Sequence, residues 1–401
     1  MQPGQGRLDW SGLTPAAVSA GFVLLVAAWI WGNPPGAAAD EPEHYVRALS
    51  VSMGTWIGAP TTRVRRFPED PERTPFLRII TRDVPVPPGL AAPASWSCFV
   101  DDHTGSGACL VRDGGADGAS HQSTYQGVYP PFYYPLPGVV MRAANDPVTA
   151  LLVGRAVTGA IGLGLLLVAA YALWDRATGP VSLLGLGLAV SPTVLSVAGT
   201  LSTSGVEIPA GLAAIAVILR LARGGPVKAW LSWALAVAIV ILVAVRPLGP
   251  VYAIALFGLG LAVFGPARLA DASRRSLVAR VGLVAILAAA VANVIWDRMY
   301  MHQTLPSLRE VPGLLVQAAP YVSESVREMI GVFGQTDTLM PSLAYALWGL
   351  AVVGLIAAAL QVGSHRQRRQ VEAAIRAVLL VGLFLALQEL STGFGINGLQ
   401  L

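Results

Sequence analysis

Charged side chains are scarce in this sequence. Only 12% of its 401 residues are Asp, Glu, Lys or Arg, whereas 54% are hydrophobic and the mean hydropathy is +0.60. A soluble domain of this length needs a larger charged surface than these residues supply. The composition therefore excludes a soluble globular protein and predicts an integral membrane protein whose remaining surface is covered by lipid.

Lysine is almost absent, since Lys228 is the only lysine among 27 basic residues. The net charge of +4 and the pI near 9.3 are compatible with nucleic-acid binding when taken alone. The arginines, however, lie mostly in short loops between apolar segments, and no basic stripe is interleaved with aromatic residues. We therefore expect no nucleic-acid partner.

Several catalytic motifs are also missing. The sequence has no Walker loop, no dinucleotide fingerprint after a strand and no Gly-x-Ser-x-Gly elbow. Nucleotide hydrolysis and serine-hydrolase chemistry thus have no support.

The chain has two cysteines, Cys98 and Cys109, and both fall in a polar region. Ten residues separate them, including Asp101-Asp102 and a Gly-Ser-Gly turn. In an oxidising compartment they would form a disulfide that closes a hairpin and stabilises it by roughly 2–3 kcal/mol. Two reduced thiols are the alternative.

Long apolar runs dominate the rest of the sequence, and each is about as long as a hydrocarbon core of roughly 30 Å requires. They cover about 14–31, 147–173, 181–199, 204–221, 229–245, 250–265, 279–296, 342–362 and 374–391. The first run follows Arg7 and lacks a clear cleavage site, which favours a retained helix over a cleaved signal peptide. These runs predict an all-α polytopic membrane protein of about nine transmembrane helices.

The runs divide the chain into five parts. We expect a cytoplasmic end with the first helix, a large polar loop domain, helices two to seven, a second loop, and helices eight and nine. Their predicted bounds are 1–32, 33–146, 147–296, 297–341 and 342–401.

Basic residues in alternate loops predict the orientation. One set of loops carries many basic residues, whereas the short loops of the other set carry only Arg246. The first set holds Arg7, Arg176, Arg220, Arg223, Lys228, Arg268, Arg274, Arg275, Arg280, Arg366, Arg368, Arg369 and Arg376. The positive-inside rule then places the amino terminus in the cytoplasm and residues 33–146 and 297–341 outside it.

The segment Asp40-Glu41-Pro42-Glu43-His44, with Arg47, concentrates charge directly after the first apolar run. Pro42 suits the first turn of a helix, so we expect Glu41 at the amino-terminal cap and Asp40 just before it. Asp40 or Glu41 then serves as a general base or helps to bind a divalent cation, while His44 and Arg47 orient an anionic group. Helix capping with a surface ion pair is the alternative, and the spacing matches no familiar zinc site.

A second motif, the aromatic run Tyr129-Pro130-Pro131-Phe132-Tyr133-Tyr134, precedes the second long apolar segment. Two interpretations stay open for Tyr129 and Tyr133. They belong to an interfacial aromatic belt, or they form a wall that binds a sugar or lipid headgroup.

Arginines at the membrane edge are the remaining candidates, because an ionised group in hydrocarbon needs a partner. Arg246, in Arg246-Pro247-Leu248-Gly249-Pro250, has the geometry to clamp a lipid phosphate, and Arg298 is a second candidate for substrate binding. Snorkelling to the headgroups is the alternative for Arg246.

Three motifs in this order resemble a known family. They are Asp40-Glu41-Pro42-Glu43-His44, the aromatic run at 129–134, and Gly331-Val332-Phe333-Gly334-Gln335-Thr336-Asp337. The sequence resembles the uncharacterised bacterial membrane family called domain of unknown function 2142, over nearly the whole chain. It departs from that family's pattern at Thr200 to Glu207, where Ser202-Thr203-Ser204-Gly205 replaces an expected Asn-Pro-Asp-like turn.

The layout is also similar to the GT-C class of membrane glycosyltransferases, whose large first outer loop carries acidic residues. That resemblance implies that Asp40 deprotonates an acceptor hydroxyl, that Glu41 assists or binds a metal, and that Arg246 holds the leaving phosphate. It also implies a polyprenyl-phosphate sugar donor and a cell-envelope glycan or lipid acceptor, at the bacterial cytoplasmic membrane. The alternatives are a lipid or polysaccharide transporter and a non-catalytic envelope assembly subunit.

Overall fold

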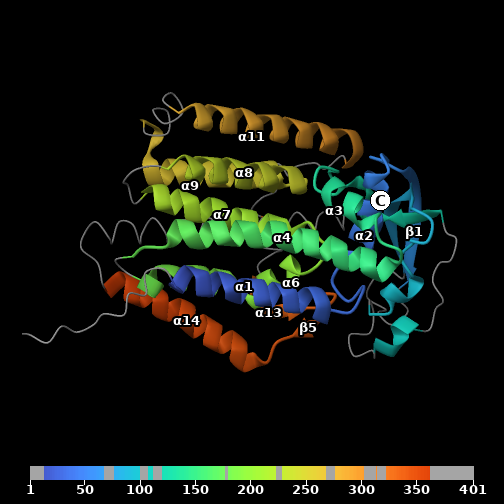
Figure 1. Ribbon diagram of the computed structural model, residues 1–401, viewed down its shortest axis with the longest axis horizontal. Coiled ribbons are helices and arrows are strands. Elements are labelled where there is room, and N and C mark those ends of the chain that lie inside the picture. The colour runs from blue at the N-terminus through green and yellow to red at the C-terminus, as the bar shows by residue number, and fades with distance from the viewer. Residues whose placement is uncertain are drawn as a thin grey trace, which may run out of the picture.

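The computed structural model describes residues 13–66, 76–99, 107–111, 120–176, 179–222, 228–267, 276–301, 313 and 322–361. The predicted run 374–391 lies outside these residues. Long helices run side by side, and short helices and strands gather at one end of them (Figure 1). We call this the α2 end, after helix α2 (Glu41–Ser52).

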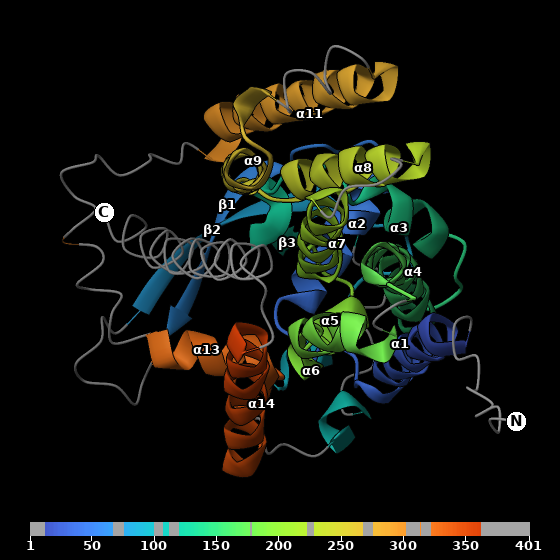
Figure 2. The same cartoon turned by 90° about the vertical axis from the view of Figure 1, so that its left-hand side faces the viewer.

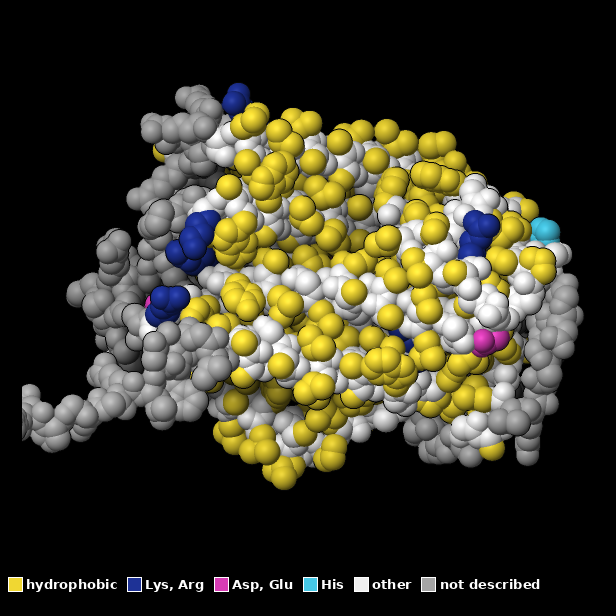
Figure 3. Space-filling model, in the orientation of Figure 1, with side chains coloured by type: hydrophobic (Ala, Val, Ile, Leu, Met, Phe, Trp, Pro, Cys, Tyr) yellow, Lys and Arg dark blue, Asp and Glu magenta, His cyan; other side chains and the backbone are white. Residues whose placement is uncertain are grey.

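Among the described residues, four helices are long and apolar enough to cross a membrane. They are α1 (Leu13–Gly32), α4 (Pro147–Leu173), α7 (Ser204–Ala222) and α11 (Leu277–Trp296). In Figure 3 hydrophobic side chains cover the middle of the visible face, whereas most of the visible Lys and Arg side chains lie toward its two ends. This distribution is what a bilayer requires.

A bent helix pair forms either a fifth, broken span or a re-entrant loop. Residues Gly179–Ala189, which form η4 (Gly179–Leu183) and α5 (Leu184–Ala189), are followed by α6 (Pro192–Ala198) at an angle of 71°. Proline lacks the N–H that would continue the first helix, so Pro192 instead starts the second one, and the Ser191 hydroxyl caps it by accepting from the Val194 N–H.

Three further apolar helices are shorter than a full span. They are α8 (Ala229–Val245), α9 (Gly249–Phe264) and α14 (Ser342–Gln361), the last apolar over Ser342–Ala358. A helix of 17 residues is only about 25 Å long, which falls short of the hydrocarbon thickness. The described residues thus contain four spans, or five if the bent pair is counted as one. Eight of the nine transmembrane helices predicted from the sequence fall in these residues, so the prediction of about nine spans is not supported.

The helices pack closely through small residues. Helix α4 lies against α1 and α7, and α7 and α11 each lie against α8 (Figure 2). A Cβ added at Gly162 of α4 would lie 2.6 Å from the carbonyl oxygen of Gly205 in α7. Only glycine permits this approach of two backbones, which is a common basis of helix association in membranes.

The predicted loop domain contains a small sheet that the sequence analysis did not foresee. Strands β1 (Ala59–Arg66), β2 (Phe76–Pro85) and β3 (His121–Thr124) pair antiparallel in that order. The register pairs Pro60 with Arg82 and Arg82 with Thr124. Helix α3 (Pro135–Met141) packs between α2 and α4, so it connects this region to the helices.

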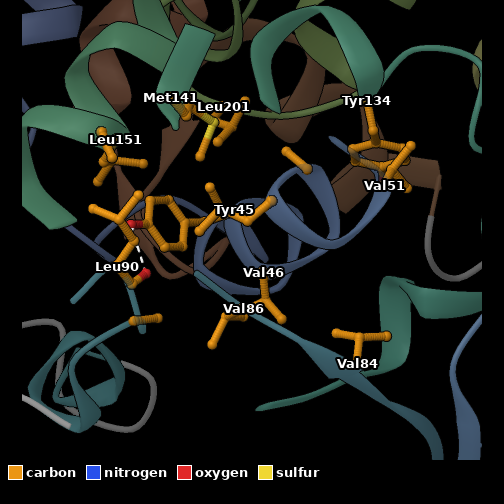
Figure 4. Packing of buried hydrophobic residues seen from close by; sticks show 14 of the residues in the cluster. Tyr45, Val46, Val51, Val84, Val86, Leu90, Tyr134, Met141, Leu151 and Leu201 are labelled. Atoms are coloured by element: carbon orange, nitrogen blue, oxygen red, sulfur yellow. Dashed lines mark hydrogen bonds between the residues drawn. The ribbon is translucent and has the colours of Figure 1, made fainter. Parts of the chain in front are cut away.

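Helix α2 packs on that sheet through a hydrophobic core (Figure 4). The Tyr45 ring meets the Trp96 ring edge-on, and the Tyr45 hydroxyl donates to the Leu90 carbonyl oxygen at 2.9 Å. Nearby, Cys98 and Cys109 are joined by a disulfide with an S–S distance of 2.04 Å. Helix α2 is therefore held rigidly at the end of the bundle.

A second small unit lies beside the bent helix pair. Helix α13 (Val322–Gly331) is followed by the hairpin of β4 (Val332–Phe333) and β5 (Thr338–Leu339). The Ser191 hydroxyl donates to the Met329 carbonyl oxygen at 2.5 Å, and the Thr193 hydroxyl donates to the Glu328 carbonyl oxygen at 2.7 Å. These bonds fix the end of α13 next to the start of α6, and the Val332 N–H of the hairpin also donates to the Thr193 hydroxyl at 3.3 Å.

Candidate functional site

Asp40 occupies an unusual position at the start of α2. The helix begins at Glu41, so Asp40 is the cap residue, and our assignment of Glu41 to the cap was wrong. The Asp40 backbone is left-handed, with φ at 59°, and its side chain accepts no capping hydrogen bond. Instead the exposed carboxylate accepts a hydrogen bond from the Tyr125 hydroxyl. A left-handed backbone is uncommon for residues other than glycine, which makes Asp40 a candidate functional residue.

Tyr125 keeps its proton in this contact. Burial raises the pKa of the Tyr125 phenol, and the neighbouring Asp40 carboxylate raises it further. The phenol therefore remains a donor to Asp40 at physiological pH.

Glu41 points the other way, into the bundle. It is fully buried, and its two carboxylate oxygens receive hydrogen bonds from Arg155 Nε at 2.7 Å and Nη2 at 2.5 Å. The Leu201 N–H donates to Glu41 Oε1 at 3.0 Å. With both oxygens engaged, Glu41 is suited to positioning the start of α2.

Arg155 was missed by the sequence analysis, although it lies within the apolar run 147–173. Besides Glu41, its guanidinium donates to the carbonyl oxygens of Ile30, Asn33 and Pro34. It ties α4 to the end of α1 and to the proline-rich turn. An arginine inside a membrane segment was the signal that would have found it.

His44 and Tyr134 join the first two sequence motifs. His44 Nδ1 lies 2.8 Å from the Tyr134 hydroxyl oxygen, and the two rings stack with centroids 5.9 Å apart. Burial, and to a lesser extent the charge of Arg246, lowers the pKa of His44 to about 3. His44 is therefore neutral at physiological pH and does not serve as a general acid there.

Arg47 is fully buried one turn further along α2. Its Nη2 donates to the Tyr129 carbonyl oxygen at 2.8 Å, and its Cζ lies 5.7 Å from the Tyr134 ring centroid and 6.0 Å from that of Trp296. Its Nε and Nη1 have no hydrogen-bond partner. Burial lowers the pKa of Arg47 to about 10, so the guanidinium still carries its charge at pH 7.

Arg246 forms an ion pair with Glu207, which we did not predict from the sequence. Its Nε lies 3.2 Å from Glu207 Oε2, and it donates to the hydroxyls of Thr203 and Ser204 at 3.2 and 2.9 Å. The second Glu207 oxygen is buried without a hydrogen bond. The segment from Thr200 to Glu207, which departs from the expected family turn, thus binds the side chain of Arg246. Its Leu201 N–H also binds Glu41.

The other predicted site residues differ in their placement. Tyr129 is half-buried, and its carbonyl oxygen accepts the bond from Arg47. Tyr133 is buried, with its hydroxyl 2.5 Å from that of Thr158 in α4. Arg298 is exposed in the short π-helical segment η5 (Asp297–Met301), and among the described residues no contact links it to α2.

The third sequence motif reaches the same site. Gln335 Nε2 donates to the carbonyl oxygens of Gly36 and Ala38, both at 3.1 Å, in the turn that leads to Asp40. The adjacent Thr336 is left-handed, with φ at 66°, and the Phe333 ring packs on Trp29 at 4.9 Å. All three motifs therefore meet at the α2 end.

The residues do not fit the divalent cation that we considered for Asp40 and Glu41. Within the described part of the chain no group of three or more His, Cys, Asp or Glu side chains is arranged to hold a metal ion. Glu41 also has both oxygens engaged by Arg155. We therefore assign no reaction step to a metal.

These features define a multi-pass membrane protein with an extramembrane region and a polar cluster at one end of its helices. Residues 22–401 match the family described as predicted membrane protein (DUF2142), and the chain belongs to that family. No curated protein and no solved structure matches this chain.

Proposed function

We propose that this protein is a membrane glycosyltransferase of GT-C type, and that Asp40 is its catalytic base. It would move a sugar from a polyprenyl-phosphate donor to a cell-envelope glycan or lipid. The α2 end would then face outward from a bacterial cytoplasmic membrane, with the amino terminus in the cytoplasm. The observation that carries the proposal is the exposed carboxylate of Asp40, held in a left-handed cap near buried arginines.

In the proposed reaction Asp40 accepts the proton of an acceptor hydroxyl. The hydroxyl oxygen forms a bond to the anomeric carbon of the sugar, and the bond from that carbon to the phosphate oxygen breaks. The electron pair stays on the lipid phosphate, whose negative charge the arginines at the α2 end stabilise. The proton remains on Asp40 until it is lost to water.

The surroundings of Asp40 support this role. Tyr125 orients the carboxylate through one oxygen and leaves the other available for a hydroxyl proton. The Glu41–Arg155 pair and Gln335 hold the two ends of the segment that carries Asp40. The pair and Gln335 keep the base in place through bonds to other atoms, and Tyr125 uses one of the two carboxylate oxygens.

The test is an Asp40→Asn variant in membrane vesicles supplied with a panel of radiolabelled polyprenyl-phosphate hexoses and envelope acceptors. We expect transfer to fall at least about 100-fold, since general-base catalysis typically contributes that much. Asp146→Asn is the matched control, because Asp146 is another exposed acid near this end that caps α4, and asparagine caps helices equally well. Wild-type transfer by Asp40→Asn would refute the role of Asp40.

Transport of a lipid or polysaccharide is the second candidate, favoured by the helix pair bent by 71°. Broken helices are common at the binding sites of transporters. Reconstituted protein that moves a labelled lipid-linked glycan across vesicles, with every glycosidic bond unchanged, would decide for transport. An envelope assembly subunit would show neither activity and would tolerate loss of Asp40.

A further inference from the structure

Arg47, Arg155 and Arg246 lie at the α2 end, and they differ in their counter-charges. Arg155 has the carboxylate of Glu41, and Arg246 has that of Glu207. Arg47 has none among the described residues, because its only hydrogen bond goes to the Tyr129 carbonyl oxygen. Arg47 is therefore the one member of this set whose charge is not compensated.

The buried and uncompensated charge of Arg47 destabilises the fold when no ligand is bound. A buried cation is normally paired, because removing it from water costs several kcal/mol that one carbonyl oxygen does not recover. The rings of Tyr134 and Trp296 offer cation–π contacts at 5.7 and 6.0 Å, which contribute only about 1–2 kcal/mol each. A methionine would fill the same space without this cost.

A second cation increases the local positive charge. Arg82 of β2 also has a buried Nε without a hydrogen-bond partner, and its charge contributes to lowering the pKa of Arg47. Two arginines that are close enough to repel each other would both be stabilised by an anion placed between them or beside them.

We propose that Arg47 is the binding residue for the phosphate of a membrane lipid, which reaches it when Trp296 moves aside. The unpaired Nε and Nη1 of Arg47 lend themselves to a phosphate group, which offers several acceptor oxygens. This assignment deepens the proposed function, since it selects Arg47 as the arginine that holds the donor phosphate, but the binding itself does not depend on sugar transfer.

Trp296 covers this position from the end of α11. Its indole N–H donates to the Val128 carbonyl oxygen at 2.8 Å, its ring meets Phe132 edge-on, and only 8% of it is exposed. The π-helical segment η5 follows at once, and such irregular turns are frequent at functional sites. In the proposal, a swing of this side chain opens the path by which the phosphate reaches Arg47.

The surface beside Trp296 indicates a lipid as the source of the phosphate. Phe132 on one side and Val291, Val294 and Ile295 on the other are all exposed, at 39–58%. An isoprenoid chain would cover these apolar side chains while its phosphate turned inward past Trp296. Val291, Val294 and Ile295 belong to the α11 span and face the bilayer, so a phosphate that reaches Trp296 along this surface arrives on a lipid.

The test measures binding of farnesyl phosphate to the purified full-length protein in lipid nanodiscs, with farnesol as the uncharged probe. We expect Arg47→Met to weaken farnesyl phosphate binding at least tenfold and to leave farnesol binding unchanged. Arg47→Lys, which keeps the charge but loses the flat donor edge, should weaken it to a smaller extent. Arg142→Gln is the matched control, because Arg142 is an exposed arginine near α2 that donates to the Ser52 carbonyl oxygen.

Three results would overturn the assignment. Wild-type affinity in both Arg47 variants would exclude Arg47, and equal loss of farnesol binding would show only damaged packing. Competition by inorganic phosphate at the same concentration as farnesyl phosphate would exclude a lipid. An Asp40→Asn protein should bind farnesyl phosphate with wild-type affinity. This result would support the role of Arg47 even if the protein were not a transferase, so each proposal can fail without the other.

Discussion

The carboxylate of Glu41 and the guanidinium of Arg155 form a bidentate pair in the interior of the protein, 114 residues apart in sequence. The pair connects the first turn of α2 to the first half of α4. Because it also binds the Leu201 N–H and three carbonyl oxygens, it fixes the position of four segments at once.

We expect Glu41→Gln to destabilise the protein by about 3–5 kcal/mol, because it leaves the Arg155 charge buried and unpaired. The apparent melting midpoint in detergent should fall, and it should fall less in the double variant Glu41→Gln/Arg155→Gln than the two single changes predict together. Unchanged stability with complete loss of transfer would instead give Glu41 a direct part in catalysis.

The left-handed backbone of Asp40 can be tested separately from its carboxylate. Glycine adopts φ near 60° without strain, whereas alanine pays roughly 1–2 kcal/mol there. Asp40→Gly should therefore melt at a higher temperature than Asp40→Ala, although both lose transfer. Equal melting midpoints for the two variants would argue against strain at this position.

His44 makes the fold sensitive to mild acid. Burial lowers its pKa from 6.5 to about 3, so between these values the unfolded chain binds a proton that the folded chain excludes. Its contribution to stability is complete above pH 6.5 and declines as the pH falls toward 3, by about 2 kcal/mol at pH 5. His44→Asn, which keeps a polar atom near Tyr134, should lose less stability than wild type between pH 7 and pH 5. Identical pH dependence in thermal melts would contradict this.

How far the sequence alone predicts this structure depends on how local each signal is. The helices follow the apolar runs closely, as at 147–173 and 204–222, because hydropathy within one segment determines them. The position of Glu41 was not predictable in this way, since its burial depends on Arg155, far along the chain. The pairing of β2 with β3 also joins segments that are separated in the sequence, and it leaves no periodic signal there.

The three sequence motifs lie together at the α2 end, but their side chains differ in burial from what we expected. Asp40 is exposed, as a base requires, whereas Glu41, His44 and Arg47 all lie inside. A helix presents its successive residues to different surroundings, and one sequence does not reveal which face another element covers. Trp296, which covers Arg47, carried no sequence signal beyond being aromatic.

The amide of Gln335 bridges the carbonyl oxygens of Gly36 and Ala38 just before Asp40. Gln335→Glu replaces the donor with a carboxylate that repels both oxygens, so the turn should loosen and Asp40 should lose its fixed position. We expect faster amide hydrogen exchange at residues 36–40 and a fall in the transfer rate, with little change in donor binding. Thr338→Val is the matched control, since its hydroxyl contacts only Asp337 within the hairpin. If Gln335→Glu left both exchange and transfer unchanged, the hairpin would have no part in positioning Asp40, and its place beside the site would be a matter of packing alone.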